Sequence, residues 1–294
     1  MQYTYSFIIP HKNCPNLLLR CVDSIPERED VQIIVVDDNS DAEKKPQLSR
    51  KDVEVILLDA EHSKGAGRAR NVGLQHAKGK WLLFADADDY YTDKLPMLLD
   101  KYAKDESTDI VYLNACMFDE GGNEKPHKTD GLIRNYLNGL KGAENNLRYN
   151  LWTPWSRMVK HQLVRENKVR FDELPACNDK MFCLYCSHYA RNISAEDVVL
   201  YKYYRPRQGS QTDSKRNLSM LDDLLDVRCR TISLYKKAGY NPIPSVLELL
   251  YNSKYSIGLS KRQLIRKYRE TLSKAKVPLV LDLSRYFSIS NRRN

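Results

Sequence analysis

The sequence predicts an α/β fold: a Rossmann-like, mostly parallel central sheet flanked by helices, with a helical appendage at the C-terminal end. Four apolar runs of strand length alternate with helix-like segments in the first third of the chain. This alternation is typical of parallel strands that are joined by right-handed crossovers. Beyond residue 213 the apolar positions follow helical spacing alone.

With 294 residues, 42% of them hydrophobic, the chain is large enough for one α/β domain with an appendage or for two smaller domains. No apolar run approaches the ~18 residues that a membrane span needs. The N-terminus lacks the features of a signal peptide, so we expect a cytoplasmic protein. Seven cysteines, an odd number, indicate reduced thiols. Cys183 and Cys186, with Cys177 nearby, have a zinc-like spacing, but without a second Cys/His pair buried core thiols are favoured.

The net charge is +9, and most of the excess lies between residues 261 and 293. A basic tail of this kind binds nucleic acid or an anionic membrane surface, or is a solvated helix face. We expect no nucleic-acid partner, because a charge excess confined to the tail leaves the acidic segments of the chain unexplained. An anionic surface on the inner face of the cell membrane is the partner that the tail would fit.

The first part of the chain places polar residues at the ends of predicted strands. The first strand ends at Pro10, which has no N–H to donate, and the second runs into Asp37 and Asp38. After the third strand, residues 62–73 form a loop whose glycines allow close backbone approach and whose arginines attract phosphate. Its glycine spacing does not match the dinucleotide fingerprint GxGxxG. The predicted elements are strand 5–10, helix 16–25, strands 31–36, 53–58 and 81–86, and helix 94–103.

The fourth strand runs straight into Asp86, Asp88 and Asp89. Asp is a poor strand former, so these acids should lie just past the carboxyl end of the strand, where open α/β sheets bind ligands. Three carboxylates this close repel one another unless a cation or hydrogen-bond donors compensate. A hard divalent ion bound to a substrate diphosphate fits that need. The alternative is an acidic loop in which Asp89 or Asp93 caps the next helix.

In the second part of the chain the pattern is weaker, and residues 125–150 give no clear signal. Trp155 lies in an aromatic segment that is either the floor of a sugar or base subsite or part of the core. Asp179 begins a helix whose dipole should lower the pKa of the carboxyl group, so it is either a general base or an N-cap. The predicted elements are strand 110–118, a hairpin turn at 119–123, helices 160–167 and 180–190, strand 198–204 and the basic, polar loop 205–212.

The order and spacing of these segments resemble bacterial family-2 glycosyltransferases of the GT-A fold. The resemblance covers roughly residues 5–212. It implies a GT-A domain at 1–212, with a nucleotide-binding half at about 1–120 and an acceptor half at about 121–212, followed by a helical region at 213–294. The matching pieces are Phe7-Ile8-Ile9-Pro10, Val35-Val36-Asp37-Asp38-Asn39-Ser40, Gly67-x-Ala69-Arg70-Asn71-x-Gly73, Ala77-Lys78-Gly79-Lys80-Trp81, Phe84-x-Asp86-x-Asp88-Asp89 and Asn178-Asp179.

The resemblance also implies roles for individual residues on the donor side. The main chain near Pro10 and the carboxylates of Asp37 and Asp38 would hold the uridine. Asp86-x-Asp88 looks like the DxD motif of the family. Asp86 would contact the ribose or a metal-bound water, and Asp88 would ligate Mn²⁺ or Mg²⁺ on the donor diphosphate. The remaining nucleotide-binding residues that we expect are Gly65, Arg68, Arg70 and Asn71.

On the acceptor side, Asp179 matches the Asp of the family's Glu-Asp pair, which is the general base of inverting members. Asn178 stands where the family has Glu, so an auxiliary carboxylate is missing and acceptor binding is less defined. The loop 205–212 resembles the segment that folds over donor and acceptor. For acceptor binding or loop closure we expect Trp155, Asn178, Arg205 and Ser210.

The resemblance therefore implies an enzyme that transfers a sugar from a UDP-sugar to a glycan or a lipid-linked saccharide and inverts the configuration at the anomeric carbon. It also implies a role in the synthesis of cell-surface polysaccharide. One alternative is a nucleotidyltransferase of similar fold. That activity would want a Gly-rich loop directly after the first strand, and residues 10–15 contain no glycine. Another alternative is a non-catalytic protein that binds membrane or nucleic-acid surfaces. This alternative does not explain the acidic cluster of Asp86, Asp88 and Asp89.

Overall fold

The protein is described here by a computed structural model that covers residues 3–205, 218–252 and 258–290. The chain divides into two compact units. One unit holds the residues up to Leu174 and those from Asn178 to the end of the last strand. The other holds the helices from Leu218 onward and the short segment Pro175–Cys177. Each unit has its own hydrophobic core.

The first unit is built on one mixed sheet with the strand order β3-β2-β1-β4-β8-β6-β9-β5, and β7 pairs with β6 at the side. The four strands from β3 to β4 are all parallel, which confirms the predicted Rossmann-like half. Their carboxyl ends therefore lie along one edge. The strands are β1 Tyr5–His11, β2 Val31–Asp37, β3 Val53–Leu57, β4 Trp81–Phe84, β5 Tyr90–Tyr91, β6 Ile110–Phe118, β7 Glu124–Pro126, β8 Arg157–Lys160 and β9 Ile193–Tyr204.

Pro10 does not end the first strand, contrary to the prediction from its missing N–H. It pairs with Val36 inside β1, which continues to His11. The carbonyl of Ile8 accepts from β4 and that of His11 accepts from the end of β2, so alternate residues of β1 face alternate neighbours. Pro10 then faces the β4 side, where pairing has already ended at Ile8. The missing donor falls where the strand has an open edge, which is where proline is tolerated.

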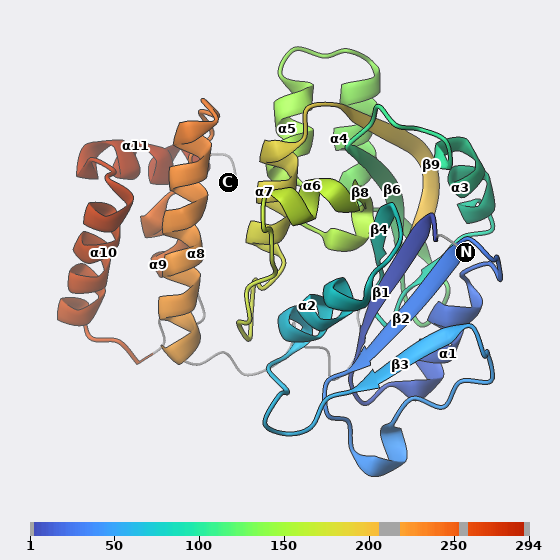
Figure 1. Ribbon diagram of the computed structural model, residues 1–294. Helices are drawn as coiled ribbons and strands as arrows, with labels where there is room; N and C mark the ends of the chain where they lie inside the picture. The colour runs from blue at the N-terminus through green and yellow to red at the C-terminus, as the bar shows by residue number, and fades with distance from the viewer. Residues whose placement is uncertain (1–2, 206–217, 253–257, 291–294) are drawn as a thin grey trace. The chain divides into compact units, whose positions relative to one another are not determined.

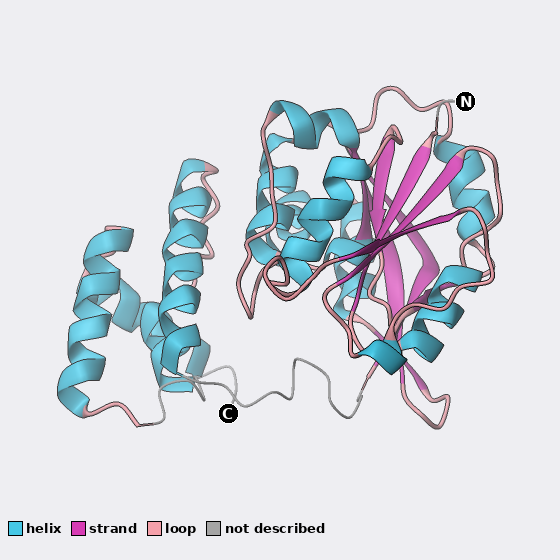
Figure 2. Cartoon of the chain, turned by 60° about the horizontal axis from the view of Figure 1, so that its bottom comes forward, coloured by secondary structure: helices cyan, strands magenta, loops and turns pink. Residues whose placement is uncertain are grey.

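Helices cover both faces of the parallel half (Figures 1 and 2). Tyr5, Phe7 and Ile9 of β1 point to the face that packs against α1 and α3, and Ile8 points to the face that α2 covers. This alternation follows from the two-residue period of a strand. The helical segments of this unit are α1 Pro15–Asp23, η1 Ala42–Lys44, α2 Ala66–His76, α3 Leu95–Tyr102, α4 Lys128–Leu137, α5 Ala143–Asn150, η2 Pro154–Ser156, α6 His161–Glu166 and α7 Lys180–Tyr189.

The second half of this unit differs from the sequence prediction in three places. The stretch without a clear signal holds two helices, α4 and α5. The short strand β8 lies antiparallel between β4 and β6, in a stretch predicted only as aromatic. β9 begins at Ile193, five residues before the predicted start, and a register shift interrupts its pairing with β6. The hairpin after β6 is confirmed by its pairing with β7.

Two buried arginines donate hydrogen bonds to backbone carbonyls of α7 and its C-cap; the N-cap of this helix is Asp179. Arg157, at the start of β8, donates to the carbonyl oxygen of Cys183 at 3.0 Å. Arg148, on α5, donates to the carbonyl oxygens of Ser187 and Ala190 at 2.8 and 2.9 Å. Arg148 is the cation at the helix C-terminus, where carbonyl groups have no partner inside the helix, whereas Arg157 bonds a carbonyl in the middle of α7. These bonds fix the axis of α7 and, with it, the position of Asp179.

The second unit consists of helices, as the spacing after residue 213 predicts. Asp282 on α11 is fully buried and accepts from the backbone N–H groups of Val246 and Leu247 at 2.8 and 3.0 Å. It thereby satisfies donors at the N-terminus of α9. Within the residues that the structure describes, no helix is long and apolar enough to cross a membrane. The helices are α8 Leu218–Lys237, α9 Val246–Asn252, α10 Lys261–Ala275 and α11 Leu279–Ser290.

All seven cysteines are thiols, and six of them are buried. Cys183 and Cys186 lie in α7 and belong to the core. Burial raises the pKa of the Cys183 thiol to about 12, so this thiol stays protonated at neutral pH. Both cysteines of this pair therefore lie in the buried part of α7.

Candidate active site

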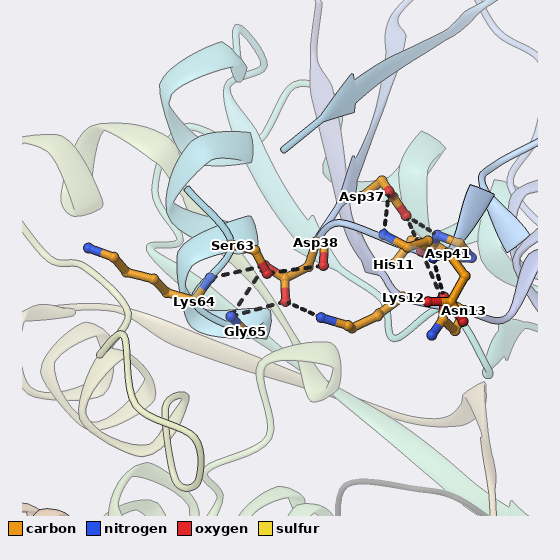
Figure 3. Close-up of polar contacts among 10 residues, drawn as sticks. His11, Lys12, Asn13, Asp37, Asp38, Asp41, Ser63, Lys64 and Gly65 are labelled. Carbon is orange, nitrogen blue, oxygen red and sulfur yellow. Dashed lines mark hydrogen bonds and ion pairs between the residues drawn. The ribbon is translucent and has the colours of Figure 1, made fainter. Parts of the chain in front are cut away.

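The carboxyl ends of β1 and β2 form a buried polar cluster (Figure 3). Asp37 is fully buried and accepts from Nδ1 of His11 at 2.7 Å and from the backbone N–H of Ser40 at 3.0 Å. The backbone N–H of Cys14 donates to Nε2 of His11 at 3.2 Å, so the ring proton lies on Nδ1. The carboxylate of Asp37 is thus engaged with its own turn, and its local role is to hold the ends of β1 and β2 together.

Asp38 lies next to this cluster and faces the segment that leads into α2. Its carboxylate accepts from the backbone N–H groups of Lys64 at 3.2 Å and Gly65 at 3.0 Å, and Nζ of Lys12 lies 3.5 Å away. Gly65 is the N-cap of α2 and has a φ of 83°, a conformation that favours glycine. Asp38 therefore fixes the approach to the α2 N-terminus, where backbone N–H groups and the helix dipole favour anions.

Most of the segment that was predicted as a loop, residues 62–73, is helical, because α2 already begins at Ala66. This corrects the setting of three expected nucleotide-binding residues, which lie on a helix and contact the segment before α7. Arg68 pairs with Glu173 at 3.4 Å. Asn71 bonds both the N–H and the C=O of Phe171, at 2.9 and 3.0 Å. The side chain of Asn71 therefore fixes the backbone at Phe171 relative to α2.

Arg70 is the residue that joins the two sides of the site. It is 5% exposed and its guanidinium lies over the ring of Phe171, 5.4 Å from the ring centre. One terminal nitrogen donates to Oδ1 of Asp86 at 2.6 Å, and the other donates to Oδ1 of Asn178 at 3.0 Å. Charge-assisted bonds of this kind fix geometry strongly. The acidic end of β4 and the start of α7, 92 residues apart in sequence (178 minus 86), are held by one side chain.

Gly67, one turn before Arg70, is required by a close approach of two backbones. A Cβ atom at this position would lie 2.0 Å from the carbonyl oxygen of Asp172 and 3.0 Å from Cβ of Asn178. Asp172 and Asn178 are themselves joined by a backbone hydrogen bond of 3.0 Å. The absence of a side chain at residue 67 therefore sets how near the segment carrying Asn178 lies to α2.

The acidic turn after β4 is fixed by groups that sequence reasoning missed. The hydroxyl of Tyr201 on β9 accepts from the backbone N–H of Asp86 at 2.9 Å and donates to Asp89 at 2.8 Å. Arg20 on α1 donates to the backbone carbonyl of Asp88 at 2.6 Å. Asp89 is fully buried, and burial together with Asp86 and Asp88 raises the pKa of its carboxyl group well above the usual range. Asp89 is therefore a structural acid of the turn.

Asp86 and Asp88 are the half-buried members of this turn. Burial raises the pKa of Asp86, and Asp88 adds to the effect while Arg70 opposes it. The alternative in which Asp89 or Asp93 caps the next helix is wrong, because the N-cap of α3 is Lys94 and no side chain caps it.

Asp179 occupies the N-cap of α7 without making a side-chain capping bond. The expectation that the helix dipole lowers the pKa of this carboxyl group is wrong in direction. Burial raises the pKa, Arg70 opposes that rise, and Asp86 adds to it. Desolvation of a half-buried carboxylate thus outweighs the dipole at the end of a ten-residue helix.

The structure therefore brings Arg70, Asp86, Asn178 and Asp179 together, and it sets Asp38 and Gly65 at the N-terminus of the same helix that carries Arg70. Two of the expected acceptor or loop residues, Trp155 and Arg205, are described and make other contacts. Trp155 is 3% exposed and stacks on Tyr201 at 4.8 Å, so the expectation of a subsite floor is wrong and the ring belongs to the core. The backbone N–H of Arg205 extends the sheet by donating to Phe118. Ser210 and the rest of the loop after Arg205 lie outside the described residues.

The site fits a divalent cation only in part. Among the described residues no group of three or more His, Cys, Asp or Glu side chains is arranged to hold a metal ion. Asp86 already uses one oxygen for Arg70. A cation that keeps its waters and binds through one or two carboxylates and a substrate diphosphate does not require such a cage. Burial raises the pKa of Asp86, and a cation nearby would act in the opposite direction.

Known proteins with similar sequences and structures bear on this site. A family model described as glycosyl transferase family 2 matches residues 6–162. Glycosyltransferase GlyG of Streptococcus pneumoniae is 26% identical over 92% of this chain and 90% of that protein. Poly(ribitol-phosphate) beta-glucosyltransferase of Bacillus spizizenii is 26% identical over 69% of this chain, but the match spans only 32% of that longer protein.

Among solved structures, that of Staphylococcus aureus TarS 1–349 in complex with UDP-GlcNAc has a TM-score of 0.71 and 17% identity, and it covers 95% of this chain and 83% of that one. At this identity the likeness concerns the fold, which is GT-A. The family match covers more than half of the chain and includes both β-strand ends that carry the acids. The chain therefore belongs to glycosyl transferase family 2 and is a glycosyltransferase.

Proposed function

We propose that this protein transfers a sugar from a UDP-sugar to a glycan or lipid-linked saccharide, with inversion at the anomeric carbon and with a divalent cation. The observation that carries the proposal is the position of Arg70 between Asp86 and Asn178 at 2.6 and 3.0 Å. One side chain thereby unites the acids of the donor side with the residue beside Asp179. The uridine donor is supported by the fold shared with TarS, which was solved with UDP-GlcNAc.

On the donor side, we assign the nucleoside to the edge near Pro10, Asp38 and the N-terminus of α2. The backbone amides of Lys64 and Gly65 already converge on Asp38, so this carboxylate and the helix N-terminus form one polar surface. Asp37 and Asn71 act there as positioning residues, since their side chains bond His11, Ser40 and Phe171. Arg68 is the arginine of α2 that remains half-exposed for a phosphate.

For the cation, Mn²⁺ or Mg²⁺, we assign Asp88 as the protein ligand, with Asp86 beside it. Such an ion neutralises the charge that develops on the leaving diphosphate. The turn that carries these acids is fixed by two hydrogen bonds: Arg20 donates to the carbonyl of Asp88, and the hydroxyl of Tyr201 accepts from the N–H of Asp86. Both bonds restrain the backbone on either side of the ligand.

For the chemical step we assign Asp179 as the general base. Its carboxylate takes the proton of the acceptor hydroxyl while the oxygen forms a bond to the anomeric carbon and the bond to the diphosphate oxygen breaks. A single displacement of this kind inverts the configuration. Burial raises the pKa of Asp179, which makes the ionised carboxylate a stronger base than an ordinary aspartate.

A thermal-shift screen of nucleotide sugars, with Mn²⁺, with Mg²⁺ and with a chelator, tests donor and metal together. We expect stabilisation by a UDP-sugar and the cation that neither gives alone. Asp88→Ala should remove the metal-dependent part and leave the protein folded. The matched control is Asp93→Ala, because Asp93 lies near the same turn but its side chain is 81% exposed. Equal metal-dependent shifts in both variants would exclude Asp88 as the ligand.

We also propose a domain organisation for the chain and a location of the protein in the cell. We propose that residues 1–212 form the catalytic GT-A domain and that the protein works in the cytoplasm, with residues 213–294 against the anionic inner face of the membrane. In support, α10 carries Lys261, Arg262, Arg266, Lys267, Arg269 and Lys274 against the one acid Glu270. Co-sedimentation with vesicles of phosphatidylglycerol, compared with phosphatidylcholine, tests this. Equal sedimentation with both would refute the electrostatic part.

A further inference from the structure

The start of α11, the helix that follows α10 in the second unit (Figure 1), exposes a run of apolar side chains. Residues 278–281, with the sequence Pro-Leu-Val-Leu, are all exposed, and Val280 is 77% exposed. Several consecutive exposed apolar residues are disfavoured on a surface that only water contacts. A patch of this kind marks a contact with another protein or with a membrane.

The apolar surface continues along α11 as an aromatic cluster. Phe287 lies seven residues after Val280 (287 minus 280), which is two turns further along the same face of the helix, and it is 60% exposed. The ring centre of Tyr286 lies 5.5 Å from that of Phe287 and 5.7 Å from that of Tyr251 on α9, which is 75% exposed. Tyrosine has an apolar body and a polar tip, so such a cluster suits the boundary between lipid and water.

The two sides of α11 are reversed relative to an ordinary surface helix, which buries its apolar stripe and exposes its charges. The one acid of α11, Asp282, is buried and accepts from two backbone N–H groups of α9 and from the hydroxyl of Tyr268 at 2.9 Å. None of the described side chains of α11 belongs to the hydrophobic core of this unit. Hydrogen bonds thus hold the helix in place, and its apolar side is left for a partner.

Positive charge surrounds the start of this surface. The ammonium group of Lys236 on α8 donates to the carbonyl oxygens of Ala275 and Lys276, at 3.1 and 2.6 Å, so it lies at the turn before α11. Lys276 is exposed and forms no ion pair within the ranges that the structure describes. Because Asp282 is buried, residues 276–290 present no acid to the solvent. An apolar patch with a cationic rim fits a membrane that carries anionic lipids.

We propose that α11 lies in the interface of an anionic bilayer, with its exposed apolar side chains between the acyl chains. Lys236 and Lys276 then lie at the lipid phosphates. This inference rests on the membrane location proposed above and adds an anchor to it, because the cations of α10 attract the protein and α11 holds it by apolar burial. An isologous contact between two copies would bring their lysines together, whereas anionic headgroups neutralise them.

The experiment measures co-sedimentation of the full chain with phosphatidylglycerol vesicles over a range of lipid concentrations. It is done at low salt and at about 0.5 M NaCl, where the Debye length is only a few ångströms. We expect the wild type to keep part of its binding at high salt. Val280→Ser and Phe287→Ser should each weaken binding roughly tenfold at both salt concentrations, because each removes an apolar group from the bilayer. Lys276→Gln should weaken it about fivefold, and at low salt only.

Met97→Ser is the matched control, because Met97 is 56% exposed on α3 of the first unit and should not affect vesicle binding. Three results would overturn the anchor: wild-type binding in Val280→Ser and Phe287→Ser, complete loss of wild-type binding at high salt, or a fall in the molar mass of Val280→Ser by light scattering without vesicles, which would assign the surface to a second copy. Equal low-salt binding to phosphatidylglycerol and phosphatidylcholine would instead refute the electrostatic location proposed above, and the high-salt comparison tests α11 separately.

Discussion

Gly67 is the position where the smallest change should have the largest effect on activity. In Gly67→Ala the new Cβ would lie 2.0 Å from the carbonyl oxygen of Asp172, whereas real Cβ contacts are essentially never below 3.0 Å. The segment around Asp172 must therefore move by about 1 Å, the difference between these distances. Asn178 moves with it, since its carbonyl is bonded to the N–H of Asp172, and the bond of 3.0 Å from Arg70 is lost.

The displaced segment carries Asp179, so the cost should fall on the chemical step. A misplacement of about 1 Å lowers the rate on the order of 10²-fold, and overpacking lowers the free energy of unfolding by about 1–3 kcal/mol. Affinity for UDP should change less than turnover, because Asp38 and Gly65 bond each other and Arg20 bonds the carbonyl of Asp88, whereas Arg68 and Asn71 of the donor side contact the moved segment. The assay is acceptor-dependent UDP release, measured beside UDP binding and urea unfolding.

Gly131→Ala is the matched control. Gly131 lies in α4, is exposed, and a methyl group added there would have nothing within 4 Å. The substitution should leave UDP release unchanged and stabilise the protein by about 0.5–1 kcal/mol. If Gly67→Ala keeps wild-type turnover at unchanged stability, then the close approach of α2 to the Asp172–Asn178 segment does not position the base.

Three further outcomes are expected. Asp179→Asn should stop transfer and leave UDP binding intact. In the wild type the pKa of Asp179 is raised, so activity should fall as the pH drops through a value above the ordinary carboxyl range. A pH–activity profile that stays flat down to ~4 would contradict the assignment. Arg20→Met should raise the Mn²⁺ concentration for half-maximal activity, with rescue at excess Mn²⁺, because it frees the carbonyl of Asp88; an unchanged Mn²⁺ titration would show that the turn holds without Arg20. Asp37→Ala should lower the free energy of unfolding in urea by about 1–3 kcal/mol, since His11 and Ser40 lose their buried acceptor, and no loss would mean that water replaces it.

The parallel half of the fold follows from the sequence because its signals are local. Strands β1, β2 and β4 are mostly apolar, and mostly apolar runs of this length specify strands buried on both faces. The exception is Pro10, whose tolerance depends on where the pairing with β4 stops. That is a property of two strands together and cannot be read from one of them.

The second half of the first unit could not be predicted from the sequence, for a different reason. β8 has only four residues and begins with Arg157, a charged residue that is fully buried because its guanidinium bonds α7 and lies over the ring of Tyr112. Nothing in four residues distinguishes such a strand from a loop. The direction of the pKa shift at Asp179 was likewise outside reach, because it depends on the desolvation that the fold produces and on Arg70, which is 109 residues away (179 minus 70).

The site itself was only partly predictable. The acids and Arg70 stand in recognisable motifs, but the residues that hold them, Arg20 and Tyr201, carry no signal of their own. Arg20 reads as an ordinary helix residue, yet its guanidinium lies within 4.8–5.6 Å of the ring centres of Tyr90, Phe118 and Tyr204. Partners this far apart in sequence become visible only once the chain is folded.

The antiparallel strand β8 has one more consequence. It joins the parallel strand β4 to the rest of the sheet through three residue pairs, and through Arg157 it also supports α7, the helix that begins beside Asp179. The parallel strands and the rest of the sheet are therefore connected at β4 by few backbone pairs. In the function proposed above, substitutions between β6 and α7 would alter the acceptor side and leave the parallel strands of the donor side unchanged.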